Sequence, residues 1–117
     1  MNAYGMLVSH SKPLQYNKDL NAVTFIHRKS PSYQVSANGN SGSIVSMVSS
    51  NFGQTWDSTC IWASTTNLGR YPQGGIYNPP GNTNIANAYI VGTGPVTGGS
   101  GWLGSWAASK QLGSYNN

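Results

Sequence analysis

Charged residues are scarce in this sequence, and glutamate is missing altogether. Asp, Glu, Lys and Arg make up 7% of the 117 residues, whereas an average soluble domain holds roughly 25%. Asp19 and Asp57 are the only acidic side chains, and we expect both in turn or strand-edge positions. A retaining or inverting glycoside hydrolase needs two carboxyl groups at a fixed separation. The composition therefore argues against a self-contained hydrolase and points away from an enzyme; no residue is predicted to be catalytic.

Metal ligands, disulfides and membrane-spanning runs are also scarce. The single cysteine, Cys60, excludes a disulfide within the chain, and its apolar neighbours predict a buried thiol. The two histidines, one cysteine and two aspartates do not show metal-ligand spacing, and calcium would need clustered carboxylates. We expect no metal and no cofactor. The sequence lacks a transmembrane run and a signal peptide, which predicts no membrane contact and either a cytoplasmic protein or an internal piece of a longer secreted chain.

The six cationic residues give a formal net charge of +4 but do not form a patch. Arg28 and Lys29 are the only adjacent pair. Binding to nucleic acid depends on basic side chains that neutralise many phosphates at once. Scattered cations instead predict a weakly basic, solvated surface without a nucleic-acid partner.

Glycine and aromatic residues are plentiful, with 15 Gly, 7 Tyr and 4 Trp. This mixture favours short strands joined by polar turns, with aromatic rings supplying much of the buried area. In the run around Phe25, alternation places Val23, Phe25 and His27 on one face of a strand, and His27 is expected to be a core residue. We predict an all-β fold without helices, whose strands are roughly Tyr4–Ser9, Ala22–Arg28, Ser43–Ser49, Thr55–Ala63, Gln73–Tyr77, Ala88–Thr93 and Gly104–Ser109.

The most informative segment is the octapeptide from Ser49 to Trp56, which predicts a tight turn between two strands. Asn51 and Gly53 are residue types that tolerate positive φ, and the Asn51 side chain can hydrogen-bond the turn backbone. Trp56 is expected to pack back under the hairpin. The pattern of the segment resembles the Asp-box, the hairpin repeat of sialidase-type β-propellers, with Asn51 where that family usually has Asp. The residues of this pattern are Ser49, Asn51, Gly53, Thr55 and Trp56.

The two halves of the chain repeat weakly, because three segments of the first half recur in the same order in the second. A repeat of this size made of four strands is typical of a propeller blade. We therefore predict a first blade over residues 1–66 and a second, incomplete blade over residues 67–117 that stops before its fourth strand.

Further segments extend the resemblance over roughly residues 2–110. Together with the octapeptide, four segments resemble secreted Bacteroidetes proteins with sialidase-like propellers, many of which carry a sorting domain for type IX secretion. These segments are Asn21–Arg28, Gly69–Thr83, Asn87–Tyr89 and Thr93–Pro95. The resemblance implies antiparallel four-stranded blades, about two in number. It also implies an extracellular or cell-surface location as part of a longer precursor. A two-sheet β-sandwich is the alternative architecture, because a sandwich needs no closure.

Fewer than two complete blades leave apolar faces and strand edges open, since closed propellers hold roughly four to eight blades. We therefore expect either a homo-oligomer or the missing remainder of a longer chain as a partner.

The resemblance also bears on the site. Sialidases bind the substrate carboxylate with an arginine triad and use a Tyr nucleophile paired with Glu. This chain has only two arginines and at most contributes part of such a site. Aromatic side chains are the better candidates because they can stack on sugar rings, with core or inter-blade packing as the alternative role. The candidate ligand-binding residues are Arg70, Tyr71, Tyr77, Trp102 and Trp106.

The residues and the resemblance together suggest three candidate functions. The leading one is a non-catalytic structural or binding module of an extracellular propeller that recognises a glycan or a protein. The second is a fragment of a sialidase-type glycoside hydrolase that lacks its acidic catalytic residues. The third is a self-assembling pair of blades.

Overall fold

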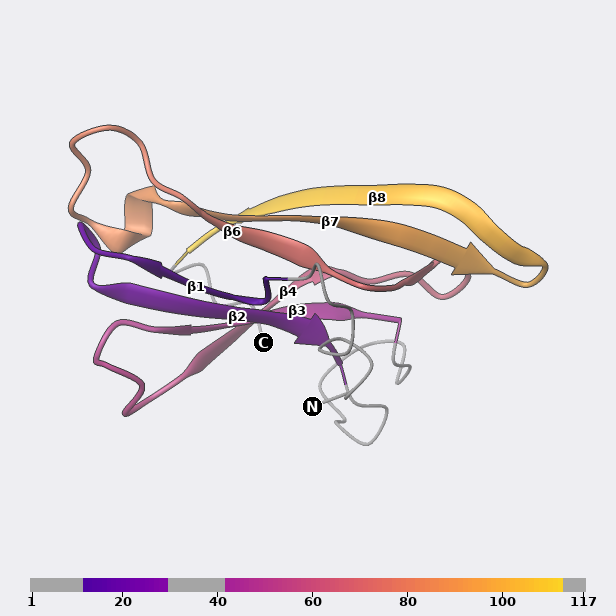
Figure 1. Cartoon of the computed structure of the whole chain (residues 1–117), viewed down its shortest axis with the longest axis horizontal. Coiled ribbons are helices and arrows are strands. Elements are labelled where there is room, and N and C mark those ends of the chain that lie inside the picture. The colour runs from indigo at the N-terminus through magenta and orange to yellow at the C-terminus, as the bar shows by residue number, and fades with distance from the viewer. Residues whose placement is uncertain (1–11, 30–41, 113–117) are drawn as a thin grey trace.

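The structure is a computed structural model that describes residues 12–29 and 42–112. Within those ranges the chain is built from strands and one short 3-10 helix (Figure 1), which confirms the predicted all-β class. The predicted strand Tyr4–Ser9 lies outside the described residues. The elements are β1 (Leu14–Asn17), β2 (Ala22–Arg28), β3 (Ile44–Ser49), β4 (Asp57–Trp62), β5 (Leu68–Gly69), β6 (Gln73–Tyr77), η2 (Ile85–Asn87), β7 (Tyr89–Gly98) and β8 (Gly101–Gln111).

The first sheet is an antiparallel meander in the order β1-β2-β3-β4. The turn between β1 and β2 is held by Asn17, whose Oδ1 accepts hydrogen bonds from the backbone N–H groups of Asp19 and Leu20 at 3.2 and 3.1 Å. Asn21 closes this turn with a φ of 47°, a conformation that Asn adopts more readily than most residues. The connection between β3 and β4 is the octapeptide turn.

The second sheet is centred on β7, which pairs with β8 along its whole length. Both β5 and β6 lie along the opposite edge of β7, because Val96 pairs with Gly69 on one side and with Gly104 on the other. Within the described residues the sheet is therefore three strands wide, with β5 and β6 forming one interrupted strand. The interruption is a β-bulge, because residues 70–72 lie opposite only two residues of β7, Gly94 and Pro95. The Arg70 N–H still bonds the Pro95 carbonyl there at 2.9 Å.

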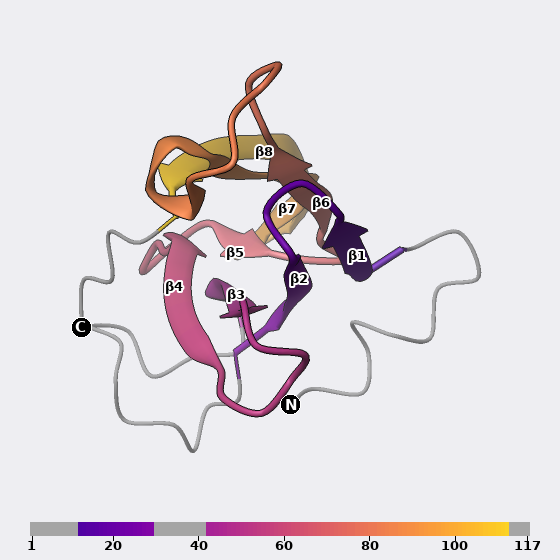
Figure 2. The same ribbon diagram turned by 90° about the vertical axis from the view of Figure 1, so that its left-hand side faces the viewer.

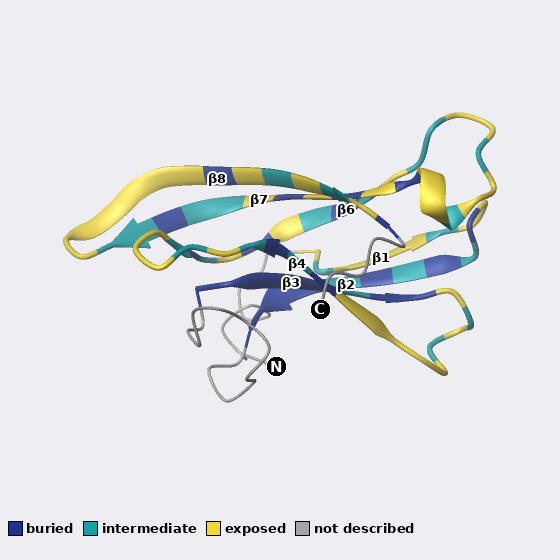
Figure 3. Ribbon diagram, turned by 180° about the vertical axis from the view of Figure 1, so that it is seen from behind, coloured by how far each residue is buried: buried dark blue, intermediate teal, exposed yellow. Residues whose placement is uncertain are grey.

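The two sheets pack face to face (Figure 2), with β1 and β2 against β6 and with β4 against β7 and β8. Between them lies the core, which is buried while the outer side of β8 is largely exposed (Figure 3). Burial of each large aliphatic side chain there contributes roughly 1.5–3 kcal/mol to stability. Its members are Leu20, Ala22, Ile26, Ile44, Val48, Ile61, Ala88, Ile90, Val96, Trp106 and Leu112.

Successive side chains along each strand point to opposite sides, which defines an inner and an outer face on each sheet. In β7 Ile90, Gly92 and Val96 are buried, whereas Tyr89, Val91 and Thr93 are exposed. In β2 the rings of Phe25 and His27 lie 5.2 Å apart between centroids, so these two residues share one face, as the sequence predicts. That face is the outer one, so His27 is buried but lies outside the core between the sheets. The β7–β8 hairpin extends past the end of the first sheet (Figure 1).

Candidate functional site

The octapeptide turn is held by a network of side-chain hydrogen bonds between β3 and β4. The Ser49 hydroxyl donates to Oδ1 of Asn51 at 2.9 Å and accepts from the Gly53 N–H at 2.9 Å. Asn51 Oδ1 also accepts from the Thr55 N–H at 2.9 Å, while its Nδ2 donates to Thr55 Oγ1 at 2.8 Å. These hydrogen bonds pair the polar groups of the turn with one another. The side chains of Ser49, Asn51 and Thr55 therefore have a structural role.

The backbone of this turn differs from the sequence-based expectation at one position. Positive φ occurs at Phe52 (59°) and Gly53 (82°), and not at Asn51. The reason is that Asn51 acts through its side chain, whose amide can bridge the turn only from the position before the left-handed residues. Trp56 does pack back, because its indole N–H donates to the Gly53 carbonyl at 3.0 Å, but it stays 40% exposed.

An exposed pair of aromatic rings lies where the β-bulge faces the start of β8. Tyr71 sits in the bulge with a φ of 41°, and its ring stacks on that of Trp102 with centroids 6.1 Å apart and planes at 30°. The two side chains are 37% and 61% exposed. Gly94 permits the bulge, because an added Cβ would lie 2.5 Å from the Arg70 carbonyl oxygen. Two sequence-predicted site residues, Tyr71 and Trp102, are thus brought together.

Trp102 and Trp106 lie on opposite faces of the second sheet, although four residues separate them. Trp106 pairs with Gly94 and faces the first sheet, whereas Trp102 pairs with Thr97, which shares the outer face with Thr93. The register shift between Val96 and Thr97 accounts for this, because one extra residue in β8 turns the following side chains to the other face.

The prediction of Trp106 as a ligand-binding residue is corrected by its burial. The side chain is 2% exposed and stacks on Trp62 with ring centroids 5.8 Å apart. A side chain that is closed off between two sheets cannot stack on a sugar. Trp106 is a core residue, in line with the alternative role of packing.

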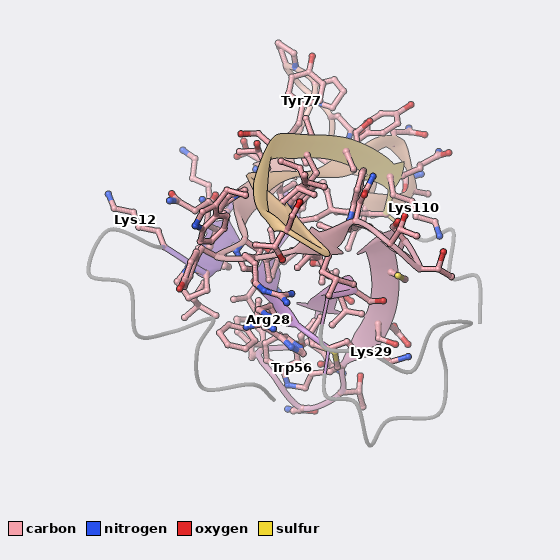
Figure 4. All side chains as sticks on the ribbon, turned by 90° about the vertical axis from the view of Figure 1, so that its right-hand side faces the viewer. Lys12, Arg28, Lys29, Trp56, Tyr77 and Lys110 are labelled. Carbon is pink, nitrogen blue, oxygen red and sulfur yellow. The ribbon has the colours of Figure 1, made fainter. Side chains whose placement is uncertain are left out.

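Arg70 and Arg28 lie near the bulge. The Arg70 guanidinium donates to the Gly69 carbonyl at 3.0 Å, and β5 is tied to the start of β3 by a Gly69 N–H to Gly42 carbonyl bond of 2.8 Å. Burial lowers the pKa of Arg28 from its usual value, and the nearby Arg70 charge lowers it further. Figure 4 views this end of the molecule, with Arg28 and Lys29 at the end of β2. The bulge therefore lies in a locally positive environment.

Tyr77 stands apart from the Tyr71–Trp102 pair. It projects from the second sheet on the side away from the first (Figure 4), is 55% exposed and pairs with Tyr89, which is 39% exposed. Between the two aromatic pairs lies a shallow hollow of about 390 Å³ on the outer face. Sequence reasoning missed both Tyr89 and this hollow, although the alternation along β7 is the signal that places Tyr89 outside. The hollow is lined by Gln73, Gly74, Val91, Gly92 and Thr93.

The remaining chemically reactive side chains of the described residues do not form a cluster. Among the described residues no group of three His, Cys, Asp or Glu side chains could hold a metal ion. Asp19 and Asp57 are exposed, in the β1–β2 turn and at the first residue of β4. Burial lowers the pKa of His27, whose Nδ1 contacts the Arg28 carbonyl at 2.8 Å. Burial also raises the pKa of the half-buried Cys60 thiol, which disfavours the reactive thiolate.

Comparisons of the chain with protein-family models, with curated proteins and with solved structures find no match. In the part of the chain that the structure describes, no helix has the length and apolar character needed to cross a membrane.

Proposed function

We propose that the chain is a non-catalytic binding module of an extracellular, sialidase-like propeller, and that it recognises a glycan at the Tyr71–Trp102 pair. The observation that carries this proposal is the stacking of two exposed rings, with centroids 6.1 Å apart, on an open face of the second sheet. Aromatic residues that lack a core role and yet stand exposed together are typical of recognition surfaces.

The chemistry of the pair suits a sugar ring. One face of a pyranose presents C–H groups, which pack on the apolar and electron-rich face of an indole or phenol ring. Arg70 lies next to Tyr71 and carries guanidinium N–H groups, which bind hydroxyl and carboxylate oxygens. The positive environment around Arg28 and Arg70 favours a glycan that carries a carboxylate.

The propeller assignment rests on the first sheet. Its strands form a four-stranded antiparallel meander, and the Asp-box-like turn joins the third strand to the fourth. This is the arrangement that the resemblance implies for one blade. The second sheet repeats the meander with β5 and β6 as its first strand, β7 as its second and β8 as its third. In this proposal the chain is a piece of an extracellular propeller.

The hydrolase alternative requires acidic groups that this chain does not supply near the bulge. Asp57 begins β4 beside the octapeptide turn, and Asp19 lies in the β1–β2 turn at the same end of the first sheet. Arg28 ends β2 at the opposite end of that sheet. Incubation with a chromogenic sialoside is therefore expected to release no product, and turnover that is lost in Tyr71→Phe would support the hydrolase instead.

The test of glycan recognition is a titration with neutral and sialylated oligosaccharides, followed by tryptophan fluorescence. Trp102→Ala and Tyr71→Ala are each expected to weaken binding by about tenfold, because each removes one stacking ring. Tyr77→Ala is the matched control, since it removes an exposed ring from the same sheet at the other end. Binding that is unchanged in Trp102→Ala but lost in Tyr77→Ala would place the site elsewhere and contradict the proposal.

A further inference from the structure

A buried indole N–H beneath the β-bulge has no hydrogen-bond partner among the described residues. It belongs to Trp106, which faces the first sheet and is 2% exposed, so that bulk water does not reach it either. An indole N–H is a donor only, and inside a protein it usually finds an acceptor. The unpaired N–H of Trp106 therefore calls for an explanation.

The carbonyl oxygen of Arg70 lacks its usual partner for a different reason. The Arg70 N–H bonds the Pro95 carbonyl at 2.9 Å, which is one half of an antiparallel hydrogen-bonded pair. In such a pair the opposite residue returns a second bond from its own N–H. Pro95 has no N–H, so the Arg70 carbonyl does not receive this bond.

The geometry at Gly94 shows that the donor and the acceptor face the same point. A Cβ atom added to Gly94 would lie 2.8 Å from the Trp106 indole nitrogen and 2.5 Å from the Arg70 carbonyl oxygen. The Tyr71 carbonyl oxygen would lie 3.2 Å from the same atom. The Trp106 nitrogen and the Arg70 oxygen are therefore no farther apart than the length of two successive hydrogen bonds.

We propose that a water molecule is bound beside Gly94, where it accepts a hydrogen bond from the Trp106 indole and donates to the carbonyl oxygens of Arg70 and Tyr71. Buried waters typically make about three hydrogen bonds to groups that are otherwise unsatisfied. An added Cβ is fixed by its bond to the Gly94 Cα atom. A free water, in contrast, takes the position at which all three contacts have hydrogen-bond length.

The water gives the bulge a defined shape. Tyr71 has a φ of 41°, which is an unfavourable conformation for a residue with a Cβ. The carbonyls of Arg70 and Tyr71 belong to the two peptide groups that flank the Tyr71 Cα atom, so one water that binds both holds this conformation. The Tyr71 ring is thereby kept on Trp102. The value of this for glycan binding rests on the proposed function, whereas the water site does not.

The test is the nuclear Overhauser effect between the Trp106 indole proton and water, measured on the ¹⁵N-labelled protein without any glycan. Paired laboratory-frame and rotating-frame spectra separate a bound water from proton exchange, and Trp106→Phe assigns the resonance. We expect a cross-peak with the sign of a water that tumbles with the protein. The Trp62 indole is the internal control, because it donates directly to the Asn67 carbonyl at 3.3 Å, and it is expected to show no such cross-peak.

Pro95→Ala gives a second readout. This substitution supplies the N–H that the Arg70 carbonyl lacks, so a direct hydrogen bond replaces the one from water and the Trp106 cross-peak is expected to be lost. Pro80→Ala is the matched control, because Pro80 lies exposed in the turn after β6, and it is expected to keep the cross-peak. Circular dichroism verifies that both variants are folded.

A parent protein without the Trp106 cross-peak overturns the proposal, and so does a cross-peak of equal strength in Pro95→Ala. Because no glycan is present in these samples, neither result bears on glycan recognition, which the oligosaccharide titration tests separately.

Discussion

Asn51 shows how much a single side chain does in this molecule. Its Oδ1 accepts hydrogen bonds from Ser49 and Thr55, and its Nδ2 donates to the Thr55 hydroxyl. An aspartate could hold the same turn, because the Thr55 hydroxyl would turn round and donate to the second carboxylate oxygen. The amide and the carboxylate therefore fill the same position of the motif, whereas a residue without a polar side chain cannot.

Asn51→Asp is expected to change the free energy of unfolding by less than about 0.5 kcal/mol, whereas Asn51→Ala is expected to lower it by about 1–2 kcal/mol, since it removes the acceptor of two donors in the turn. Urea unfolding followed by tryptophan fluorescence measures both. Equal losses in the two variants would show that the side-chain network does not hold the turn.

His27 gives the molecule a pH dependence with a defined sign. Burial holds the pKa of His27 below its ordinary value of 6.5, so the unfolded chain binds the proton more readily than the folded chain. The stability linked to His27 is therefore fully present above about pH 6.5 and is lost as pH falls through the folded-state pKa.

His27→Gln is expected to flatten the fall in unfolding free energy between about pH 7 and about pH 5. Thermal unfolding of the parent and the variant at matched pH values measures this. The same slope in both proteins would assign the pH dependence to another group.

The elements of the fold differ in how well local sequence specifies them. The bounds of β2 and β6 equal those of the predicted strands, because both segments contain β-branched and aromatic residues and have turn residues such as Asn21, Pro72 and Asn78 beside them. β1 and β5 were missed: three of the four β1 residues are exposed, and β5 has two residues, so neither carries a hydrophobic pattern. Their pairing depends on β2 and β7, which is tertiary information.

The long β7–β8 hairpin was underestimated for a different reason. Pro95 lacks an N–H and usually ends a strand, so the predicted strand stopped at Thr93. Here the Pro95 carbonyl bonds to the bulge at Arg70, and the strand continues to Gly98.

The same hairpin contributes Trp102 to the candidate site. The sequence predicts both Tyr71 and Trp102 as site residues. The register shift between Val96 and Thr97, which exposes Trp102 and buries Trp106, has no signal in the local sequence.

The close contact of the two sheets at Gly92 leads to a prediction about stability. An added Cβ at Gly92 would lie 2.9 Å from the Ile61 Cδ1 atom and 3.0 Å from the Trp106 ring. Gly92→Ala is therefore expected to lower the unfolding free energy by about 1–3 kcal/mol through overpacking. Gly99→Ala is the control, because nothing lies within 4 Å of the added atom, and it is expected to be neutral in the same denaturation assay. Equal stability of both variants would mean that the sheets separate readily at this point.

At the scale of the whole molecule, two antiparallel sheets bury one shared core and leave two unlike outer faces. The first sheet presents Leu14, Tyr16 and their neighbours, and the second presents the hollow and two aromatic pairs. Of the two aromatic pairs, the Tyr71–Trp102 pair lies toward the turn of the β7–β8 hairpin, because Trp102 is the second residue of β8.

The most direct test of the recognition site is a ¹⁵N-resolved NMR spectrum of the tryptophan indole N–H groups, recorded while a sialylated or neutral oligosaccharide is added. The four tryptophans report on three parts of the molecule, because Trp62 and Trp106 stack on each other. Trp102→Phe assigns the Trp102 resonance. Our account predicts that the Trp102 resonance moves with ligand concentration while those of the buried Trp106 and the turn residue Trp56 stay in place. Movement of the Trp56 resonance alone, or a Trp102 resonance that no member of the oligosaccharide panel shifts, would contradict it.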